Sequence, residues 1–181
     1  GQRGARRLNI RPINEFDGKG WLANKPRTKP VTTVVLHATA GGSLAGAVST
    51  LRRKGLGYHY LIERDGQIWK CVPTSGNCGH AGTSNGPDGS GVNGYSIGVS
   101  FVHPNDGSPI DPRAIDAAGE LLRTLADAIP SIEWLTTHYA ITVKANGQYR
   151  KSDPRMCPVS ALASEAGLKP WKPSYATRFS L

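Results

Sequence analysis

The sequence is poor in cysteine and in acidic residues and has no long apolar run, and each scarcity excludes a class of protein. Its three cysteines, Cys71, Cys78 and Cys157, are an odd number, which excludes a full disulfide framework. Cys71 and Cys78 are near enough to pair across a short loop, although free buried thiols are the simpler expectation. No apolar stretch approaches the ~20 residues that cross a bilayer, so we expect no membrane span.

Acidic side chains are scarce relative to basic ones. The chain has 13 Asp and Glu against 22 Lys and Arg, which gives a formal net charge of +9. A basic surface favours polyanionic partners such as nucleic acid, anionic lipid or an acidic cell envelope. Zinc-finger spacing and a basic sheet rich in aromatic residues are both missing, so we expect no nucleic-acid partner. The charge alone does not choose among the other partners.

Strand and helix patterns are mixed along the chain. With 181 residues, 38% of them hydrophobic, the chain is long enough for one domain with a real core. The expected strands are 31–36, 58–63, 67–72, 95–101 and a short one ending at 138, and the expected helices are 44–53, 111–129 and 159–165. This mixture predicts an α/β (α+β) fold, a single domain with a central mixed β-sheet flanked by helices.

The two ends of the chain differ in composition from this domain. Residues 1–30 are basic and punctuated by glycine and proline, which predicts an N-terminal arm. We expect the domain itself to span residues 31–168 and a C-terminal tail to follow over residues 169–181.

Two histidines occupy similar positions in the pattern. His37 and His138 each end an apolar, strand-like run, and Asp153 lies later in the sequence Arg-Lys-Ser-Asp-Pro. Two imidazoles and one carboxylate are a donor set typical of catalytic zinc, which leaves a fourth position for water. Lys151 precedes Asp153 by two residues, so in an extended segment both side chains face the same side. The residues therefore predict a Zn²⁺ site with an ammonium group beside it.

Several motifs occur in one order along the chain: VVLHATAG, GYHYLIERDGQIW, GHAG, SIGVSF, TTH and RKSDP. In these motifs the sequence resembles the zinc-dependent N-acetylmuramoyl-L-alanine amidases, the family that includes phage amidase lysozymes and peptidoglycan-recognition proteins. The resemblance covers residues 31–168 and implies a mixed sheet with zinc in a surface groove. It also implies cleavage of the amide between N-acetylmuramic acid and L-alanine of the stem peptide. His80, in the GHAG motif, is predicted to contact that substrate, and a hydrogen bond that fixes its loop is the alternative.

The resemblance implies a role for each matching residue. His37, His138 and Asp153 fall at the zinc-ligand positions. Lys151 falls where many members place a catalytic lysine, and Tyr58 falls where phage members place a catalytic tyrosine.

Three departures from the family pattern leave questions open. Ser100 occupies a strand position where some members have a glutamate, so the general base is undetermined. The segment from His138 to Lys151 is longer than usual. Some members use a cysteine before proline as the third ligand, and Cys157 offers this alternative to Asp153. We favour Asp153, because it keeps a lysine two residues before the ligand.

Three function classes are compatible with these patterns: an amidase, a peptidoglycan-binding module that has lost catalysis, and a basic nucleic-acid binder. Every ligand position is filled, which favours the enzyme, and only charge supports the third class. We therefore expect a monomeric peptidoglycan hydrolase that acts on the bacterial cell wall. A phage endolysin and a bacterial envelope amidase both fit this description.

Overall fold

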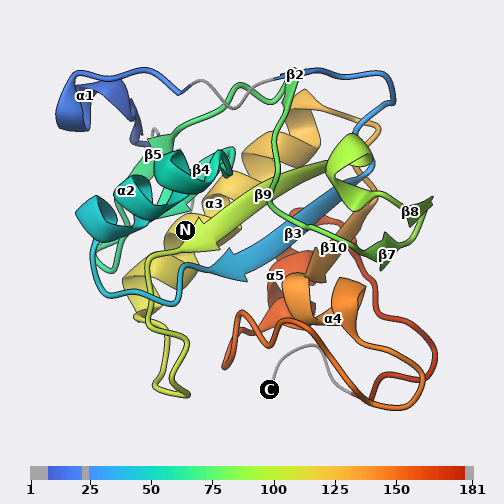
Figure 1. The fold of residues 1–181 in the computed structure, drawn as a ribbon. Coiled ribbons are helices and arrows are strands. Elements are labelled where there is room, and N and C mark those ends of the chain that lie inside the picture. The colour runs from blue at the N-terminus through green and yellow to red at the C-terminus, as the bar shows by residue number, and fades with distance from the viewer. Residues whose placement is uncertain (1–7, 22–24, 178–181) are drawn as a thin grey trace, which may run out of the picture.

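A computed structural model of the chain describes residues 8–21 and 25–177, and a seven-stranded sheet runs through its centre. The strands lie in the order β1-β5-β4-β9-β3-β10-β11 (Figure 1). Their bounds are Ile10–Pro12 (β1), Thr33–Ala38 (β3), Tyr60–Ile62 (β4), Ile68–Lys70 (β5), Ser96–Phe101 (β9), Trp134–Thr137 (β10) and Lys169–Pro170 (β11). Separate short ladders pair β2 (Lys25–Pro26) with β6 (Gly76–Asn77) and β7 (Asn85–Gly86) with β8 (Gly89–Ser90).

The pairing directions make the sheet mixed, as the sequence predicts. The central strand β3 pairs in parallel with β9 on one side and with β10 on the other. β4 is parallel to β9, whereas β4 and β5 form the expected antiparallel hairpin. Since neighbouring parallel strands end at the same edge of a sheet, the carboxyl ends of β3, β9 and β10 meet there.

Helices cover both faces of this sheet. α3 (Pro112–Ala128) and α5 (Val159–Ala166) pack on one face, and α2 (Leu44–Lys54) and α4 (His138–Thr142) lie on the other (Figure 1). Val34 and Leu36 belong to the core beneath α3 and α5, whereas Val35 packs with Ile141 of α4. Because side chains alternate along a strand, His37 points to the same face as Val35.

The helix boundaries follow the expected capping signals. In α2, Ser43 Oγ accepts a hydrogen bond from the Gly46 N–H at 3.1 Å, and Gly55 ends the helix with φ 66°. In α3, Asp111 caps the Arg113 N–H and proline occupies the first turn. The sequence did not predict α4, which begins where Thr137 Oγ1 caps the Ala140 N–H. Two short helices complete the fold, α1 (Asn14–Asp17) and η1 (Val92–Tyr95).

Both edges of the sheet come from segments that the sequence assigned to an arm and a tail. β1 pairs with β5, and β11 pairs with β10, so the expected boundaries at 31 and 168 exclude two strands of the sheet. These strands are only three and two residues long and each contains a proline, so no alternating pattern identifies them. Arg27 also attaches to the domain, since its Nη2 donates to the Ser96 carbonyl at 2.8 Å. The basic stretch 1–7, the segment 22–24 and residues 178–181 lie outside the described residues.

The structure also bears on the expectations about cysteine pairing and membrane-spanning helices. Cys71, Cys78 and Cys157 are free and buried, so Cys71 and Cys78 do not pair. In the described part of the chain, none of the helices has the length and apolar character needed to cross a membrane.

His59 is a buried polar residue that joins the sheet to the loop beside it. Its Nδ1 accepts a hydrogen bond from the Gly98 N–H at 3.0 Å, and its Nε2–H donates to the Gly76 carbonyl at 2.8 Å. Burial lowers the pKa of His59 to about 4. The side chain is therefore neutral in the folded protein over most of the pH range in which an exposed histidine titrates.

This lowered pKa predicts a loss of stability in mild acid. Between pH ~6.5 and 4 the unfolded chain binds a proton at His59 that the folded chain does not, so the free energy of unfolding falls as the pH falls. The slope from this group approaches about 1.4 kcal/mol per pH unit. Urea unfolding with chelator present should show a shallower slope in His59→Gln than in the wild type. Equal slopes would contradict a neutral, buried His59.

Candidate metal centre

Three potential metal ligands meet at the carboxyl ends of the central strands. His37 is the fifth residue of β3, and His138 is the first residue of α4, directly after β10. In the parallel register Leu36 pairs with Thr137, so the two histidines follow at equivalent positions on neighbouring strands. The loop before α5 brings Asp153 to them, and all three residues are buried.

Their donor atoms converge on one point. His37 Nδ1 lies 3.1 Å from His138 Nδ1, and His138 Nδ1 lies 3.2 Å from Asp153 Oδ1. Asp153 Oδ2 lies 3.7 Å from His37 Nδ1 and accepts the Ala38 N–H at 3.0 Å. One atom of each residue lies within 4.8 Å of the others, a group that can hold a metal ion.

The other ring nitrogens are held by second partners. His138 Nε2 lies 3.1 Å from the Ala81 carbonyl, which only accepts, so Nε2 carries the proton and Nδ1 presents a lone pair. His37 Nε2 lies 2.9 Å from His80 Nδ1, and His80 Nε2 lies 3.1 Å from Ser96 Oγ. When His37 Nδ1 is unprotonated, His37 Nε2–H donates to His80, whose own Nε2–H then donates to the serine hydroxyl. Such outer partners orient metal-binding histidines.

The electrostatics fit a cation at the point of convergence. Burial lowers the pKa of His37 well below its ordinary value, and the neighbouring His138, His80 and Lys151 act in the same direction. Burial likewise lowers the pKa of His80. When Nδ1 of His37 and of His138 is unprotonated, as it is in a metal ligand, two lone pairs and a carboxylate face one another. These acceptors repel unless a positive ion lies between them, and nitrogen and oxygen donors in this number suit a transition metal.

His80 lies elsewhere than the sequence analysis expected. It is only 7% exposed and sits behind His37, against the backbone of β9, where a Cβ on Gly98 would lie 2.7 Å from its ring. This position leaves it little surface for a substrate contact. The hydrogen bond to His37 indicates a supporting role instead.

Tyr58 and Ser100 lie beside His37. The rings of Tyr58 and His37 are 4.8 Å apart, and Ser100 of β9 pairs with His37 in the sheet register. Burial raises the pKa of Tyr58 above its ordinary value, the Asp153 carboxylate raises it further, and a hydrogen bond with Ser100 opposes both. The phenol therefore stays protonated and can donate a hydrogen bond.

Lys151 lies at the exposed rim of the site. Its backbone is tied to α4, because the Lys151 N–H donates to Thr142 Oγ1 at 3.3 Å and that hydroxyl donates to the His138 carbonyl at 2.9 Å. The ammonium is near enough for its charge to lower the pKa of His37. Within the described residues it forms no ion pair.

Cys157, the alternative third ligand, lies apart from the histidines. It is buried in the core cluster beneath α3 and α5, and burial raises the pKa of its thiol to about 12. A neutral, packed thiol is a poor metal ligand. Among the two alternatives, Asp153 is the residue that the structure brings to His37 and His138.

Sequence reasoning missed the residues that support the ligands. The Ala81 carbonyl receives hydrogen bonds from His138 and, at 2.7 Å, from Arg150 Nη2. Ser96 ends the row that starts at His37. The GHAG motif does mark the segment that contains Ala81, but a backbone carbonyl carries no sequence signal of its own.

A mixed sheet with a buried His-His-Asp group at the ends of its central strands fits the class of hydrolases that can hold a metal ion. Comparison with known families identifies it further. The chain belongs to the N-acetylmuramoyl-L-alanine amidase family, whose sequence profile matches residues 27–156. No curated protein sequence matches the chain.

Solved structures share the fold. The N-acetylmuramoyl-L-alanine amidase LysC from Clostridium intestinale is 18% identical with a TM-score of 0.69, and the match covers 89% of this chain and 99% of LysC. AmpDh3 from Pseudomonas aeruginosa is 26% identical with a TM-score of 0.67, and the match covers 87% of this chain and 68% of AmpDh3. AmiD from E. coli, solved with anhydro-N-acetylmuramic acid-L-Ala-D-γ-Glu-L-Lys, is 24% identical with a TM-score of 0.67; the match covers 83% of this chain and 63% of AmiD.

The ligand assignment predicts different metal contents for two variants. Asp153→Ala should lose most bound metal, because it removes one of three ligands. Cys157→Ala should retain the metal while losing some thermal stability, because it only leaves a small cavity in the core. Metal content after equilibrium dialysis, read by mass spectrometry, checks both. A metal-free Cys157→Ala with an intact Asp153→Ala would reverse the assignment.

The supporting role of His80 predicts a graded effect. His80→Leu removes the acceptor for His37 Nε2–H, whereas His80→Asn keeps an acceptor near the Nδ1 position. Loss of an outer partner typically weakens metal affinity about 10- to 100-fold. Competition with a chromophoric chelator should therefore show weaker binding in the leucine variant and partial recovery in the asparagine variant. Wild-type affinity in His80→Leu would rule the role out.

Proposed function

We propose that this amidase is zinc-dependent and cleaves the amide between the lactyl group of N-acetylmuramic acid and L-alanine of the stem peptide. The convergence of two Nδ1 lone pairs and the Asp153 carboxylate carries the proposal. This donor set suits Zn²⁺, whereas calcium and magnesium require more oxygen ligands. When bound, zinc lowers the pKa of water towards about 7 and polarises a carbonyl group.

The residues around the ligands supply the remaining chemistry. The Lys151 ammonium, held at the rim through Thr142, stabilises the negative charge that develops on the scissile carbonyl oxygen. One such donor is typically worth roughly 3 kcal/mol of transition-state stabilisation. Tyr58 keeps its proton because its pKa is raised, so its hydroxyl orients the reacting groups by donation.

The route of the proton differs from members that have a glutamate in the β9 strand. Ser100 occupies that position and hydrogen-bonds with Tyr58, but a hydroxyl is too weak a base to accept a proton near neutral pH. Asp153, whose Oδ2 accepts the Ala38 N–H, or a second water molecule therefore has to share the proton transfer.

The substrate class is consistent with a related structure. AmiD was solved with a muramyl tripeptide that contains D-γ-Glu. A γ-linked glutamate keeps its α-carboxylate free, and the peptide ends in a second carboxylate. A net charge of +9 favours association with an anionic cell wall, on which we propose that the protein acts as a monomer, as an endolysin or an envelope amidase.

Digestion of purified peptidoglycan tests the proposal. Mass spectrometry should find intact glycan strands and free stem peptides that begin with L-alanine. Chelator should abolish the products and zinc should restore them. Cleaved glycan or cross-bridge bonds would overturn the bond assignment, and a protein that only pellets with the wall would be a binding module.

A lysine variant separates catalysis from metal binding in the same assay. Lys151→Met should keep its zinc and lose roughly 100-fold in kcat, because the oxyanion loses its donor. Lys70→Met, at the far side of the sheet, serves as a control for the loss of one surface charge. Unchanged turnover in Lys151→Met would remove the lysine from the mechanism.

A further inference from the structure

A cavity of about 1010 Å³ lies beside α4, next to the metal centre but separate from its ligands. Its walls come from the 83–85 segment, from the end of α4 and the loop over residues 143–150, and from Tyr175 near the C-terminus. Two residues that line the cavity connect it to Lys151. Thr142 accepts a hydrogen bond from the Lys151 N–H, and Arg150 precedes that lysine in the sequence.

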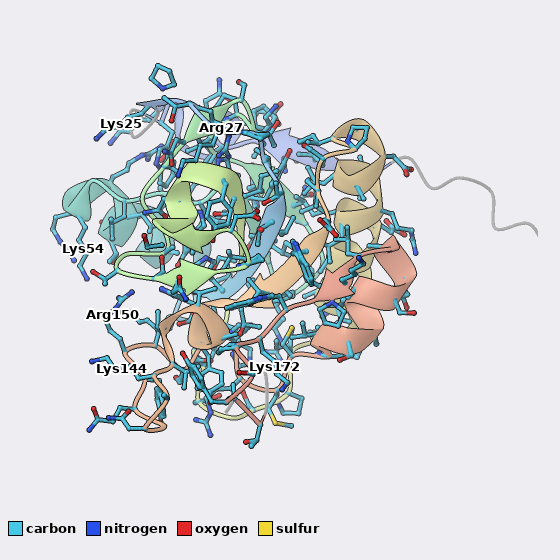
Figure 2. The ribbon with its side chains drawn as sticks, turned by 90° about the vertical axis from the view of Figure 1, so that its right-hand side faces the viewer. Lys25, Arg27, Lys54, Lys144, Arg150 and Lys172 are labelled. Atoms are coloured by element: carbon cyan, nitrogen blue, oxygen red, sulfur yellow. The ribbon has the colours of Figure 1, made fainter. Side chains whose placement is uncertain are left out.

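The charges in this cavity have one sign. Lys144 and Arg150 line it, and among the described residues that form its walls there is no aspartate or glutamate. Figure 2 shows both cations on the same side of the molecule, along the segment that follows α4. Two cations without a neighbouring carboxylate favour an anionic ligand.

Arg150 uses only one of its side-chain nitrogens, Nη2, for hydrogen bonds to the described residues. Its Nη2 donates to the Ala81 carbonyl at 2.7 Å and to the Thr83 carbonyl at 3.1 Å. The guanidinium packs on Gly82, where a Cβ would lie 2.7 Å from Nη2 and would displace it, and the φ of 63° also favours glycine there. Within the described residues, Nε and Nη1 donate to no protein acceptor. These N–H groups suit a carboxylate, which matches the planar guanidinium geometry.

The loop that carries Lys144 is held by its own hydrogen bonds. The Lys144 N–H donates to the Gln148 carbonyl at 2.7 Å, and the Gly147 N–H donates to the Lys144 carbonyl at 2.9 Å. Tyr175 Oη donates to the Val143 carbonyl at 3.0 Å and so joins the C-terminal segment to this loop. Tyr149 and Tyr175 remain about half exposed, at 48% and 47%, and form apolar surface beside the cations.

We propose that this cavity is a subsite for a carboxylate of the stem peptide, bound by Lys144 and Arg150. The proposal rests on the amidase function proposed above, in which the scissile amide lies at the metal centre. An extended peptide advances about 3.3–3.6 Å per residue, so the carboxylates of the second and third residues lie roughly 7–11 Å from the scissile amide. The glycan is a poorer match, because its N-acetylated sugars are neutral and its lactyl carboxyl is part of the scissile amide.

The test compares substrates that differ only in charge. N-acetylmuramoyl-L-Ala-D-γ-Glu-L-Lys is assayed beside the same compound amidated at the glutamate α-carboxylate, at the C-terminus, or at both. Wild-type kcat/KM should be higher for the free acid than for the doubly amidated compound, and the single amides identify which carboxylate is bound. Lys144→Gln should lower this preference roughly two- to fivefold, the range for an exposed ion pair, and Lys144→Glu should reverse it.

Lys144 is the residue to vary, because Arg150 also supports the Ala81 carbonyl and hence His138. Lys70→Gln is the matched control, since it removes one exposed lysine at the far side of the sheet and should keep the wild-type preference. Hydrolysis of all compounds at equal rates by the wild type would overturn the subsite while leaving the amidase intact. Absence of hydrolysis for every compound would overturn the proposed function instead.

Discussion

The mutual repulsion of three hydrogen-bond acceptors is the constraint on which the site depends. Two imidazole nitrogens and a carboxylate face one another within 4.8 Å, an arrangement that a cation between them would stabilise. The surroundings maintain it: burial keeps His37 neutral, and His80 and the Ala81 carbonyl hold the outer ring nitrogens. Protonation or rotation of either ring would relieve the repulsion, and both are opposed by these contacts. These three residues therefore form a group that can hold a metal ion.

Parallel pairing of β3, β9 and β10 converts distant residues into neighbours. His37 and His138 are 101 positions apart in sequence. Each nevertheless directly follows one member of a pair in the sheet register, Leu36 and Thr137. Side-chain alternation then decides which face they occupy. Val34 and Leu36 fill the core beneath α3 and α5, so His37 must point to the opposite face. α2, α4 and the loop that contains Ala81 lie on that face. The apolar core and the candidate metal centre therefore lie on opposite faces of β3.

The features that could be predicted from the sequence are those with local signals. Capping residues and apolar periodicity located α2 and α3, and histidines at strand ends located His37 and His138. Edge strands β1 and β11 are too short for a pattern, and α4 depends on a threonine cap inside a strand-like run. The sequence marked His80 but not its burial behind His37, because that burial depends on the path of a loop. Arg150 supports His138 through the Ala81 carbonyl, and a backbone carbonyl cannot be recognised from the residue type.

Both ends of the described chain close the edges of the sheet, and this limits how the protein can be shortened. Trimming it to the 27–156 segment shared with the family would remove β1, β11 and α5 together. The N–H and C=O groups of β5 and β10 would lose their partners, and the core beneath α5 would be opened to water. Unpaired sheet edges recruit strands from other molecules. A shortened version of this amidase would therefore need other residues to cover β5 and β10. Changes to the active site are better made in the intact chain.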